Sequence, residues 1–304
     1  MLGCWTRRAL AAALLVLCGC GGPPAAYAPR FEARAPAAHE YSFAVHPLYN
    51  PQQLDRVYEP LVDTLNRRVP GAHFTLVASR DYANFENRLS QERFDFALPN
   101  PYQTLLAVKH HYAVFGKLGD DQRFQGLILV RRHGGVNALK DLEGAAISYP
   151  APTAVEGTMM PQYFLATHGV PLARTRSLYV GSQDSSIESL YRGASRAAAT
   201  WPPPWEAYQR AHPEVAAALE VKWRTPTLVN NGLVVHDTVP PEVARQVAAV
   251  LWSLPQTPEG RRILAGIGTS RFEPATEQTY APVKAFFARY EAKVGPIRQT
   301  VANP

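Results

Sequence analysis

The sequence predicts an α/β fold with largely parallel sheets, and three observations support this prediction. From Tyr41 onward, short apolar stretches alternate with longer amphipathic ones, as strands alternate with helices in such folds. Prolines and N-capping residues stand where several amphipathic stretches begin. The chain has 304 residues, which is enough to bury a core as one large domain or as two lobes.

The first half of the pattern contains three strands and three helices. Strands are expected over residues 41–46, 73–79 and 94–98, and helices over residues 51–68 and 82–90. A third helix follows Asn100, which is expected to be its N-cap, with Pro101 at the first helical position.

The second half repeats the alternation. Strands are expected over residues 124–130, 145–148, 177–180, 197–200 and 228–235, and helices over 158–168 and 185–191. Beyond residue 235 only helices are expected, over 241–254, 258–267 and 277–293. The three consecutive prolines at residues 202–204 are expected to form a rigid loop.

The N-terminal residues have the pattern of an export signal. Arg7 and Arg8 precede an apolar run over residues 9–17, which is too short to span a bilayer. The following Leu17-Cys18-Gly19-Cys20 resembles the lipobox of bacterial lipoproteins, with a small residue before the cysteine that is lipidated. Residues 1–19 are therefore expected to be a lipoprotein signal peptide. The alternatives are an ordinary secretory signal cut near residues 25–26 and a retained transmembrane anchor.

Cys20 is expected to have one role, as a lipid anchor. The three cysteines are Cys4, Cys18 and Cys20, so the body has no disulfide and no thiol chemistry. Residues 20–39 are rich in Ala and Pro and are expected to form a flexible tether. We expect a periplasmic, membrane-anchored lipoprotein. Gly21 permits sorting to the outer membrane, so the choice between inner and outer membrane stays open.

The composition argues against several classes of function. The net charge of +6 is spread along the chain without a run of five like charges, which argues against nucleic-acid binding. The sequence has no G-x-S-x-G elbow, no P-loop and no G-x-G-x-x-G after a strand. Its nine histidines are dispersed, and no carboxylate pair is recognisable as acid and base. We expect no enzyme activity, no metal and no cofactor.

Four segments at strand-to-helix junctions are distinctive. They are residues 45–51 (VHPLYNP), 94–102 (FDFALPNPY), 180–185 (VGSQDS) and 190–193 (LYRG). In this order and spacing they resemble the periplasmic phosphate/phosphite/phosphonate-binding proteins of ABC transporters. The resemblance extends over residues 41–289, and it implies a solute-binding protein that delivers a small anion to an ABC permease of the inner membrane, as a monomer.

The resemblance also implies the architecture of type 2 periplasmic binding proteins. In this architecture each of two lobes has a mainly parallel sheet with helices on both faces, and two crossing hinge strands join the lobes. The crossings are expected at residues 126–131 and 228–235. Lobe I then comprises residues 40–130 and 228–304, and lobe II residues 131–227, with the ligand in the cleft between them.

The ligand-binding residues follow from the same resemblance. In lobe I they are Tyr49, Asn100 and Tyr102, for which helix capping or plain packing is the alternative. A helix N-terminus offers amide donors and a favourable dipole to an oxyanion. In lobe II the expected residues lie in the loops that follow the strands: Thr153, Glu156, Thr158, Ser182, Asp184 and Trp201. Asp184 could instead cap a helix that begins at Ser185, and Trp201 could be a packing residue.

Lobe II departs from the pattern of these families. Phosphonate binders show Asp-Pro and then Ser-Thr-Ser-Gly before the helix, whereas residues 151–157 read APTAVEG. Only Thr153 and Thr158 supply hydroxyls, and Glu156 would repel a dianion by about a few kcal/mol. Gln183 also replaces a common His, and Arg196 a usual Asp. A different, non-phosphorus solute therefore remains an alternative, as does a ligand-sensing accessory for a membrane signalling partner.

Overall fold

The computed structural model describes residues 38–298 of the chain. The predicted signal peptide, Cys20 and nearly all of the predicted tether lie outside the described residues. Within residues 38–298, no helix combines the length and the apolar character needed to cross a membrane.

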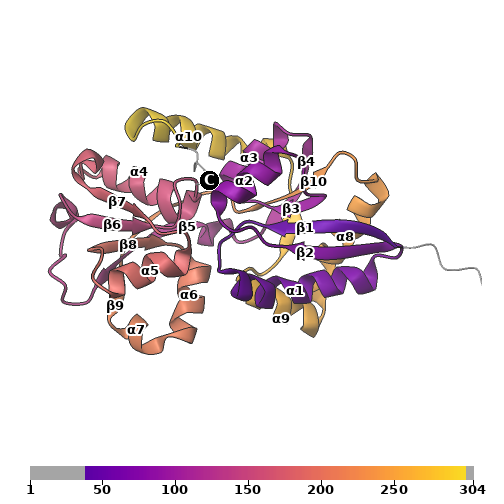
Figure 1. Ribbon diagram of the computed structural model, residues 1–304, viewed down its shortest axis with the longest axis horizontal. Helices are drawn as coiled ribbons and strands as arrows, with labels where there is room; N and C mark the ends of the chain where they lie inside the picture. The colour runs from indigo at the N-terminus through magenta and orange to yellow at the C-terminus, as the bar shows by residue number, and fades with distance from the viewer. Residues whose placement is uncertain (1–37, 299–304) are drawn as a thin grey trace, which may run out of the picture. The chain divides into compact units, whose positions relative to one another are not determined.

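The described chain forms two separate sheets (Figure 1). The first has six strands in the order β11-β4-β10-β3-β1-β2. Its strands are β1 (His39–Val45), β2 (Ala72–Val77), β3 (Phe96–Leu98), β4 (Tyr112–Leu118), β10 (Gly232–His236) and β11 (Phe272–Pro274). The second has five strands in the order β7-β6-β8-β5-β9. These are β5 (Gln125–Arg131), β6 (Ala146–Tyr149), β7 (Arg176–Tyr179), β8 (Ala197–Thr200) and β9 (Leu219–Thr227).

Both sheets are mixed, which corrects the expectation of mainly parallel sheets. In the first, β1 is parallel to β2 and β3, whereas β10 and β11 pair antiparallel with their neighbours. In the second, β6 is parallel to β7 and β8, whereas β5 is antiparallel to β8 and β9. Parallel neighbours need a long crossover such as a helix, and the antiparallel strands β4, β5, β9 and β10 join the sheets by short connections.

Ten α-helices cover the sheets within the described residues. With the first sheet are α1 (Pro51–Arg68), α2 (Tyr82–Ser90), α3 (Pro101–Val108), α8 (Pro241–Ser253), α9 (Pro258–Ile267) and α10 (Ala281–Lys293). With the second are α4 (Met160–Thr167), α5 (Gln183–Tyr191), α6 (Pro202–Ala211) and α7 (Pro213–Ala217). A π-helical turn over Val155–Met159 leads directly into α4.

Alternation along the strands gives each sheet two apolar faces, as strand geometry requires. In β1, Phe43 and Val45 belong to the core shared with α1, α8 and α9, whereas Ala44 faces α2 and α3. In β5, Leu127 and Leu129 face α5 and α6, whereas Ile128 and Val130 face α4. The helices therefore lie on both faces of each sheet, in agreement with the predicted α/β fold.

Several elements differ from the expectations. β4 and β9 were not expected, and β11 shows that the chain after residue 235 is not only helical. β9 contains charged residues and Pro226, and it is an edge strand, where such residues are tolerated. The expected loop at residues 202–204 is wrong, because these prolines begin α6. The first turn of a helix does not use its amide hydrogens, so proline is accepted there.

The last helix contacts elements of both sheets. In Figure 1, α10 lies beside α4, and Tyr290 Oη donates a hydrogen bond to Gln162 Oε1 at 2.6 Å. The rings of Phe286 and Tyr163 pack edge to face at 5.6 Å. α10 therefore ties α4 of the second sheet to the first sheet's core, where Val283 is buried.

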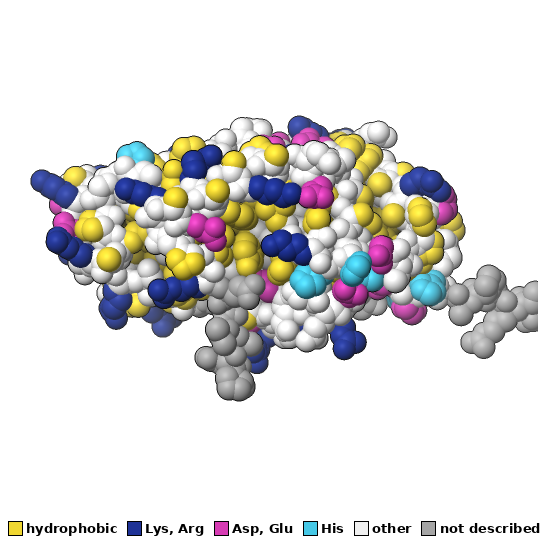
Figure 2. Space-filling model, turned by 90° about the horizontal axis from the view of Figure 1, so that it is seen from above, with side chains coloured by type: hydrophobic (Ala, Val, Ile, Leu, Met, Phe, Trp, Pro, Cys, Tyr) yellow, Lys and Arg dark blue, Asp and Glu magenta, His cyan; other side chains and the backbone are white. Residues whose placement is uncertain are grey.

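Basic side chains are spread over the surface. On the face shown in Figure 2, Lys and Arg side chains stand apart from one another and form no continuous patch. Many of them pair with carboxylates, as Arg174 does with Glu143 at 2.6 Å and Arg123 with Glu206 at 2.7 Å. This distribution differs from the clustered basic surface of nucleic-acid-binding proteins.

Candidate functional site

Buried polar residues gather where strands of both sheets end. In open α/β sheets, ligands bind beyond the carboxyl ends of the parallel strands. His46 follows β1, Asn100 follows β3, Thr153 follows β6 and Thr200 ends β8, and none of these four side chains is exposed. The ends of four strands thus bring polar groups into an interior position.

Asn100 is the N-cap of α3, as the sequence predicts, and it also contacts the second sheet's part of the chain. Its Oδ1 accepts from the amide of Gln103 at 3.0 Å, and the Gln103 side chain accepts from the Asn100 amide at 3.1 Å. The remaining Nδ2 group donates to the Thr153 carbonyl at 2.9 Å. Asn100 is therefore a helix cap, one of the two alternatives that the sequence left open, and it also makes a contact with the second sheet's loop that was not expected.

Glu86 of α2 holds Thr153 through a second contact. The Thr153 hydroxyl donates to Glu86 Oε1, which also accepts from Gln103 Nε2 at 3.1 Å. Burial raises the pKa of Glu86 to about 7, although both hydrogen bonds favour the ionised form. We call Glu86, Asn100 and Thr153 the Thr153 clasp, because its two first-sheet residues bind both the hydroxyl and the carbonyl of Thr153.

Glu156 is a second buried carboxylate, in the π-helical turn before α4. Gln183 Nε2 donates to Glu156 Oε1 at 3.2 Å, and Gln183 Oε1 in turn accepts from the Thr200 hydroxyl at 2.9 Å. Glu156 Oε2 receives no hydrogen bond of good geometry from residues 38–298. Burial raises the pKa of Glu156 to about 7.

The turn that carries Glu156 approaches Gln183 closely. A Cβ atom on Gly157 would lie 2.8 Å from Gln183 Nε2 and 2.8 Å from Pro150 Cγ. Only glycine fits this position without displacing its neighbours. The first main-chain hydrogen bond of the turn is donated by the Met159 amide to the Ala154 carbonyl at 3.1 Å. The amides of the residues just before Met159 therefore have no partner within the turn, as at any helix N-terminus, and Glu156 lies at this end.

Tyr82, the first residue of α2, lies near both carboxylates. Its side chain is buried and packs in one apolar cluster with Ala151 and Ala154 of the second sheet's loop. Burial raises the pKa of Tyr82, and the charges of Glu156 and Glu86 raise it further. Both carboxylates are therefore close enough to the Tyr82 hydroxyl to influence its ionisation.

No basic side chain neutralises these carboxylates. Among residues 38–298, neither Glu86 nor Glu156 forms an ion pair or hydrogen bond with Lys or Arg. His46 packs edge-on against Tyr82, with ring centroids 6.1 Å apart, and burial lowers its pKa to about 4. His46 is therefore neutral at neutral pH, and the site carries negative charge wherever its carboxyls are ionised.

Tyr49 and Asp184 form a neighbouring group. Both are largely shielded from solvent, and Tyr49 lines a pocket of about 350 Å³ with Glu206 and Arg210. Burial raises the pKa of Asp184 to about 6. Burial also raises the pKa of Tyr49, with the Asp184 charge as the next cause, so these two predicted residues lie together.

Ser182, not Asp184, caps α5. The helix begins at Gln183, two residues before the expected start, and the Ser182 hydroxyl accepts from the Ser185 amide at 3.1 Å. The alternative that Asp184 caps a helix beginning at Ser185 is therefore wrong. Asp184 lies in the first turn, where a carboxylate is favoured by the helix dipole.

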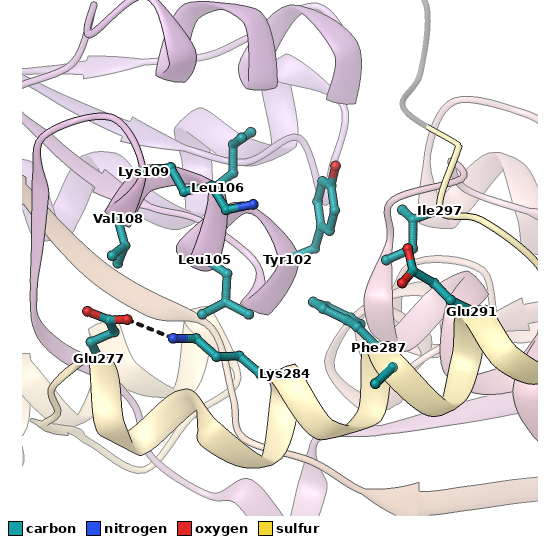
Figure 3. Close-up of a pocket in the computed structure, with 11 residues that line it drawn as sticks. Tyr102, Leu105, Leu106, Val108, Lys109, Glu277, Lys284, Phe287, Glu291 and Ile297 are labelled. Carbon is teal, nitrogen blue, oxygen red and sulfur yellow. Dashed lines mark hydrogen bonds and ion pairs between the residues drawn. The ribbon is translucent and has the colours of Figure 1, made fainter.

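The described contacts of Tyr102 are with α10. Figure 3 shows Tyr102 beside Phe287 and Leu105 in a groove of about 590 Å³ between α3 and α10. The Tyr102 and Phe287 rings pack edge to face at 5.9 Å. On the opposite side of this groove, Lys284 and Glu277 form an ion pair at 2.7 Å. Tyr102 therefore packs against α10, and its role in ligand binding stays a prediction.

Trp201 and Thr158 are both buried. The Trp201 ring packs on Phe124 with centroids 5.4 Å apart, and it follows Thr200, which binds Gln183. Neither Trp201 Nε1 nor Thr158 Oγ1 has a hydrogen-bonding partner within residues 38–298. Unpaired buried polar atoms are rare in proteins and call for an explanation.

Several residues of the cluster were not predicted as site residues, among them Tyr82, Glu86 and Gln103. Each lies within a helix whose sequence pattern is that of any amphipathic helix. Glu86 and Thr153 are 67 residues apart in the chain, so no local pattern connects them. The only local signal was the spacing of Asn100 and Gln103, which is that of a capping box.

Comparisons with known proteins identify the family. Residues 43–280 match the family model described as "ABC transporter, phosphonate, periplasmic substrate-binding protein". A probable ABC transporter phosphite-binding protein, PhnD1 from Prochlorococcus marinus, is 26% identical over 119 residues. That alignment covers 36% of this chain and 40% of the relative's length.

Solved structures show the same fold. Prochlorococcus marinus PhnD1 in complex with methylphosphonate has a TM-score of 0.77 at 19% identity, covering 84% of this chain and all of that one. A binding protein component of an ABC phosphonate transporter from Pseudomonas aeruginosa has a TM-score of 0.76 at 17% identity, covering 84% and 88%. The two-sheet arrangement is that of type 2 periplasmic binding proteins, and these relatives are transport-associated binding proteins. This chain therefore belongs to the family of periplasmic substrate-binding proteins of phosphonate ABC transporters.

Proposed function

We propose that this protein captures a small solute between its two sheets and delivers it to an ABC permease of the inner membrane. The observation that carries the proposal is the Thr153 clasp, in which Glu86 and Asn100 hold a loop of the second sheet. The loop that carries Thr153 leads into the π-helical turn of Glu156 and Thr158, and both of these residues have a buried polar atom without a hydrogen-bonding partner within residues 38–298. Polar atoms that converge between two mobile bodies are suited to enclosing a polar solute.

The two bodies are proposed to be lobe I, which contains the first sheet, and lobe II, which contains the second. β5 (Gln125–Arg131) lies in the second sheet, so the expected lobe boundary at residue 130 and the expected crossing at residues 126–131 move to the connection before β5. The chain passes between the sheets in two places, between β4 and β5 and between β9 and β10. Rotation about these two connections would open and close a cleft over the cluster, as in hinge-type closure. In the closed form the Thr153 clasp is made, and in the open form it is broken.

Solute capture can be tested by titration and by scattering. Calorimetric titration of the mature protein with phosphate, phosphite, methylphosphonate and 2-aminoethylphosphonate is expected to show at least one dissociation constant below millimolar. Small-angle scattering with that solute at saturation should show a smaller radius of gyration than without it. If no compound binds and the radius does not change, the proposal is contradicted.

Membrane attachment is proposed to occur through Cys20, which lies outside the described residues. The support is the apolar run that precedes it and the small residue at position 19. Mass spectrometry of the mature protein from membranes should find a lipid-modified cysteine as the first residue. The Cys20→Ser variant should lack the lipid, whereas an unmodified N-terminus near residue 26 in the natural chain would contradict the anchor.

A further inference from the structure

The loop that follows β6 has a carboxylate where an oxyanion would need hydrogen-bond donors. Glu156 stands at the open N-terminal end of the turn leading into α4, where amides and the helix dipole attract negative charge. Ala154 and Val155, which precede it, have no polar side-chain atoms. The protein's own carboxylate therefore occupies the position in which helix N-termini hold bound anions.

A second carboxylate lies on the facing element. Glu86 is only 6% exposed, and the nearest described partners of the two carboxylates are neutral groups of Thr153, Gln103 and Gln183. Burying a carboxylate without a cation is costly, and the raised pKa values of both groups express this cost. A bound dianion would add to the negative charge of the site, whereas a bound cation would stabilise the ionised form of both carboxyl groups.

The other side chains of the cluster suit a cation. Tyr82 is buried, and the charges of both carboxylates act on its hydroxyl. Aromatic faces attract ammonium groups, most strongly where water is excluded. Glu156 Oε2 is fully buried and accepts no hydrogen bond of good geometry from residues 38–298, so it is available to an ammonium N–H.

We propose that the solute is a small organic ammonium compound whose protonated amine binds Glu156 beside Tyr82. The proposal rests on the proposed function, since it assigns the chemistry of the solute that the same cleft captures. The family resemblance implies that this loop binds an anionic group, whereas the proposal places a cationic group there. A phosphonate group is compatible with such a solute but is not the group that the loop recognises.

The pH dependence of binding follows from the ionisation of the groups around Glu156. These are Tyr82 and Glu86 of α2 and the neutral His46 that packs on Tyr82. An ammonium ligand requires the ionised carboxylate, so its affinity should rise between pH 5.5 and pH 8. A phosphonate bound to a protonated carboxyl would show the opposite trend.

The test compares 2-aminoethylphosphonate with ethylphosphonate, which lacks only the amine, and with ethanolamine, which lacks the phosphonate. Calorimetry of the mature protein at pH 8 is expected to show both amines binding at least about ten-fold tighter than ethylphosphonate. The Glu156→Gln variant should lose this preference. The matched control Glu143→Gln, which changes an exposed carboxylate paired with Arg174, should keep it.

The outcomes separate this inference from the proposed function. If ethylphosphonate binds as tightly as the amines, or if the amines bind more weakly at pH 8 than at pH 5.5, the inference is overturned and solute capture stands. If none of the three binds, and scattering with the wider set of solutes shows no compaction, solute capture itself fails. A preference for amines that survives Glu156→Gln also overturns the role of Glu156.

Discussion

Replacing both buried glutamates by glutamine is expected to stabilise the protein increasingly, relative to the natural chain, as the pH rises from about 4.5 to about 7. The folded-state pKa values of Glu86 and Glu156 are raised from 4.5 to about 7 by burial. Between these values the folded state binds more protons than the unfolded state, so each carboxyl lowers the free energy of unfolding as pH rises. The expected effect is up to about 3 kcal/mol for each group.

The comparison with the natural chain isolates these two groups. His46 acts in the opposite direction, since burial lowers its pKa from 6.5 to about 4, but it is present in both proteins and cancels. Urea denaturation at pH 4.5, 5.5 and 7 would measure the difference in unfolding free energy between Glu86→Gln/Glu156→Gln and the natural chain. A difference that does not change with pH would show that the carboxyls titrate normally.

The second large effect is expected from Thr153→Val, which keeps the shape of the side chain and removes its hydroxyl. The buried Glu86 would then keep only the hydrogen bond from Gln103 when the cleft is closed. Hydrogen bonds to charged groups contribute about 1.5–3 kcal/mol. Solute affinity is therefore expected to fall by about 10-fold to 100-fold, measured by calorimetry.

A matched variant controls for the loss of a buried hydroxyl. Thr64 is also buried, and its hydroxyl donates to the Pro60 carbonyl at 2.8 Å within α1, away from the cluster. Thr64→Val should bind solute with nearly the natural affinity. If Thr153→Val folds normally and binds within about two-fold of the natural chain, the Thr153 clasp does not stabilise the closed form.

The helices were predictable where local chemistry defines their ends. α1 spans residues 51–68 and α9 residues 258–267, as expected, and each begins with a proline after a capping residue. The prolines at 202–204 show the limit of such signals, because the same residue type marks a loop or a helix start. β4 and β9 pair antiparallel with strands distant in the sequence, and no helix follows either as part of a strand-helix repeat.

The site was predictable only in part. Asn100 lies in a segment that resembles a known family, whereas Thr153 and Glu156 lie in a loop that departs from the pattern of that family. The structure brings Asn100 and Thr153 into contact. Glu86 and Tyr82 could not be found in this way, because their contacts are with the loop that follows β6 of the second sheet. The charge of Glu156 was evident from the sequence, whereas its burial away from any cation can be seen only in the folded structure.

A crystal structure of the mature protein with its bound solute would test the central claim most directly. The solute is expected between the two sheets, with its amine within hydrogen-bonding distance of Glu156 and the Thr153 hydroxyl still donating to Glu86. A solute bound in the groove between α3 and α10, or contacted by residues of one sheet only, would contradict capture between the sheets.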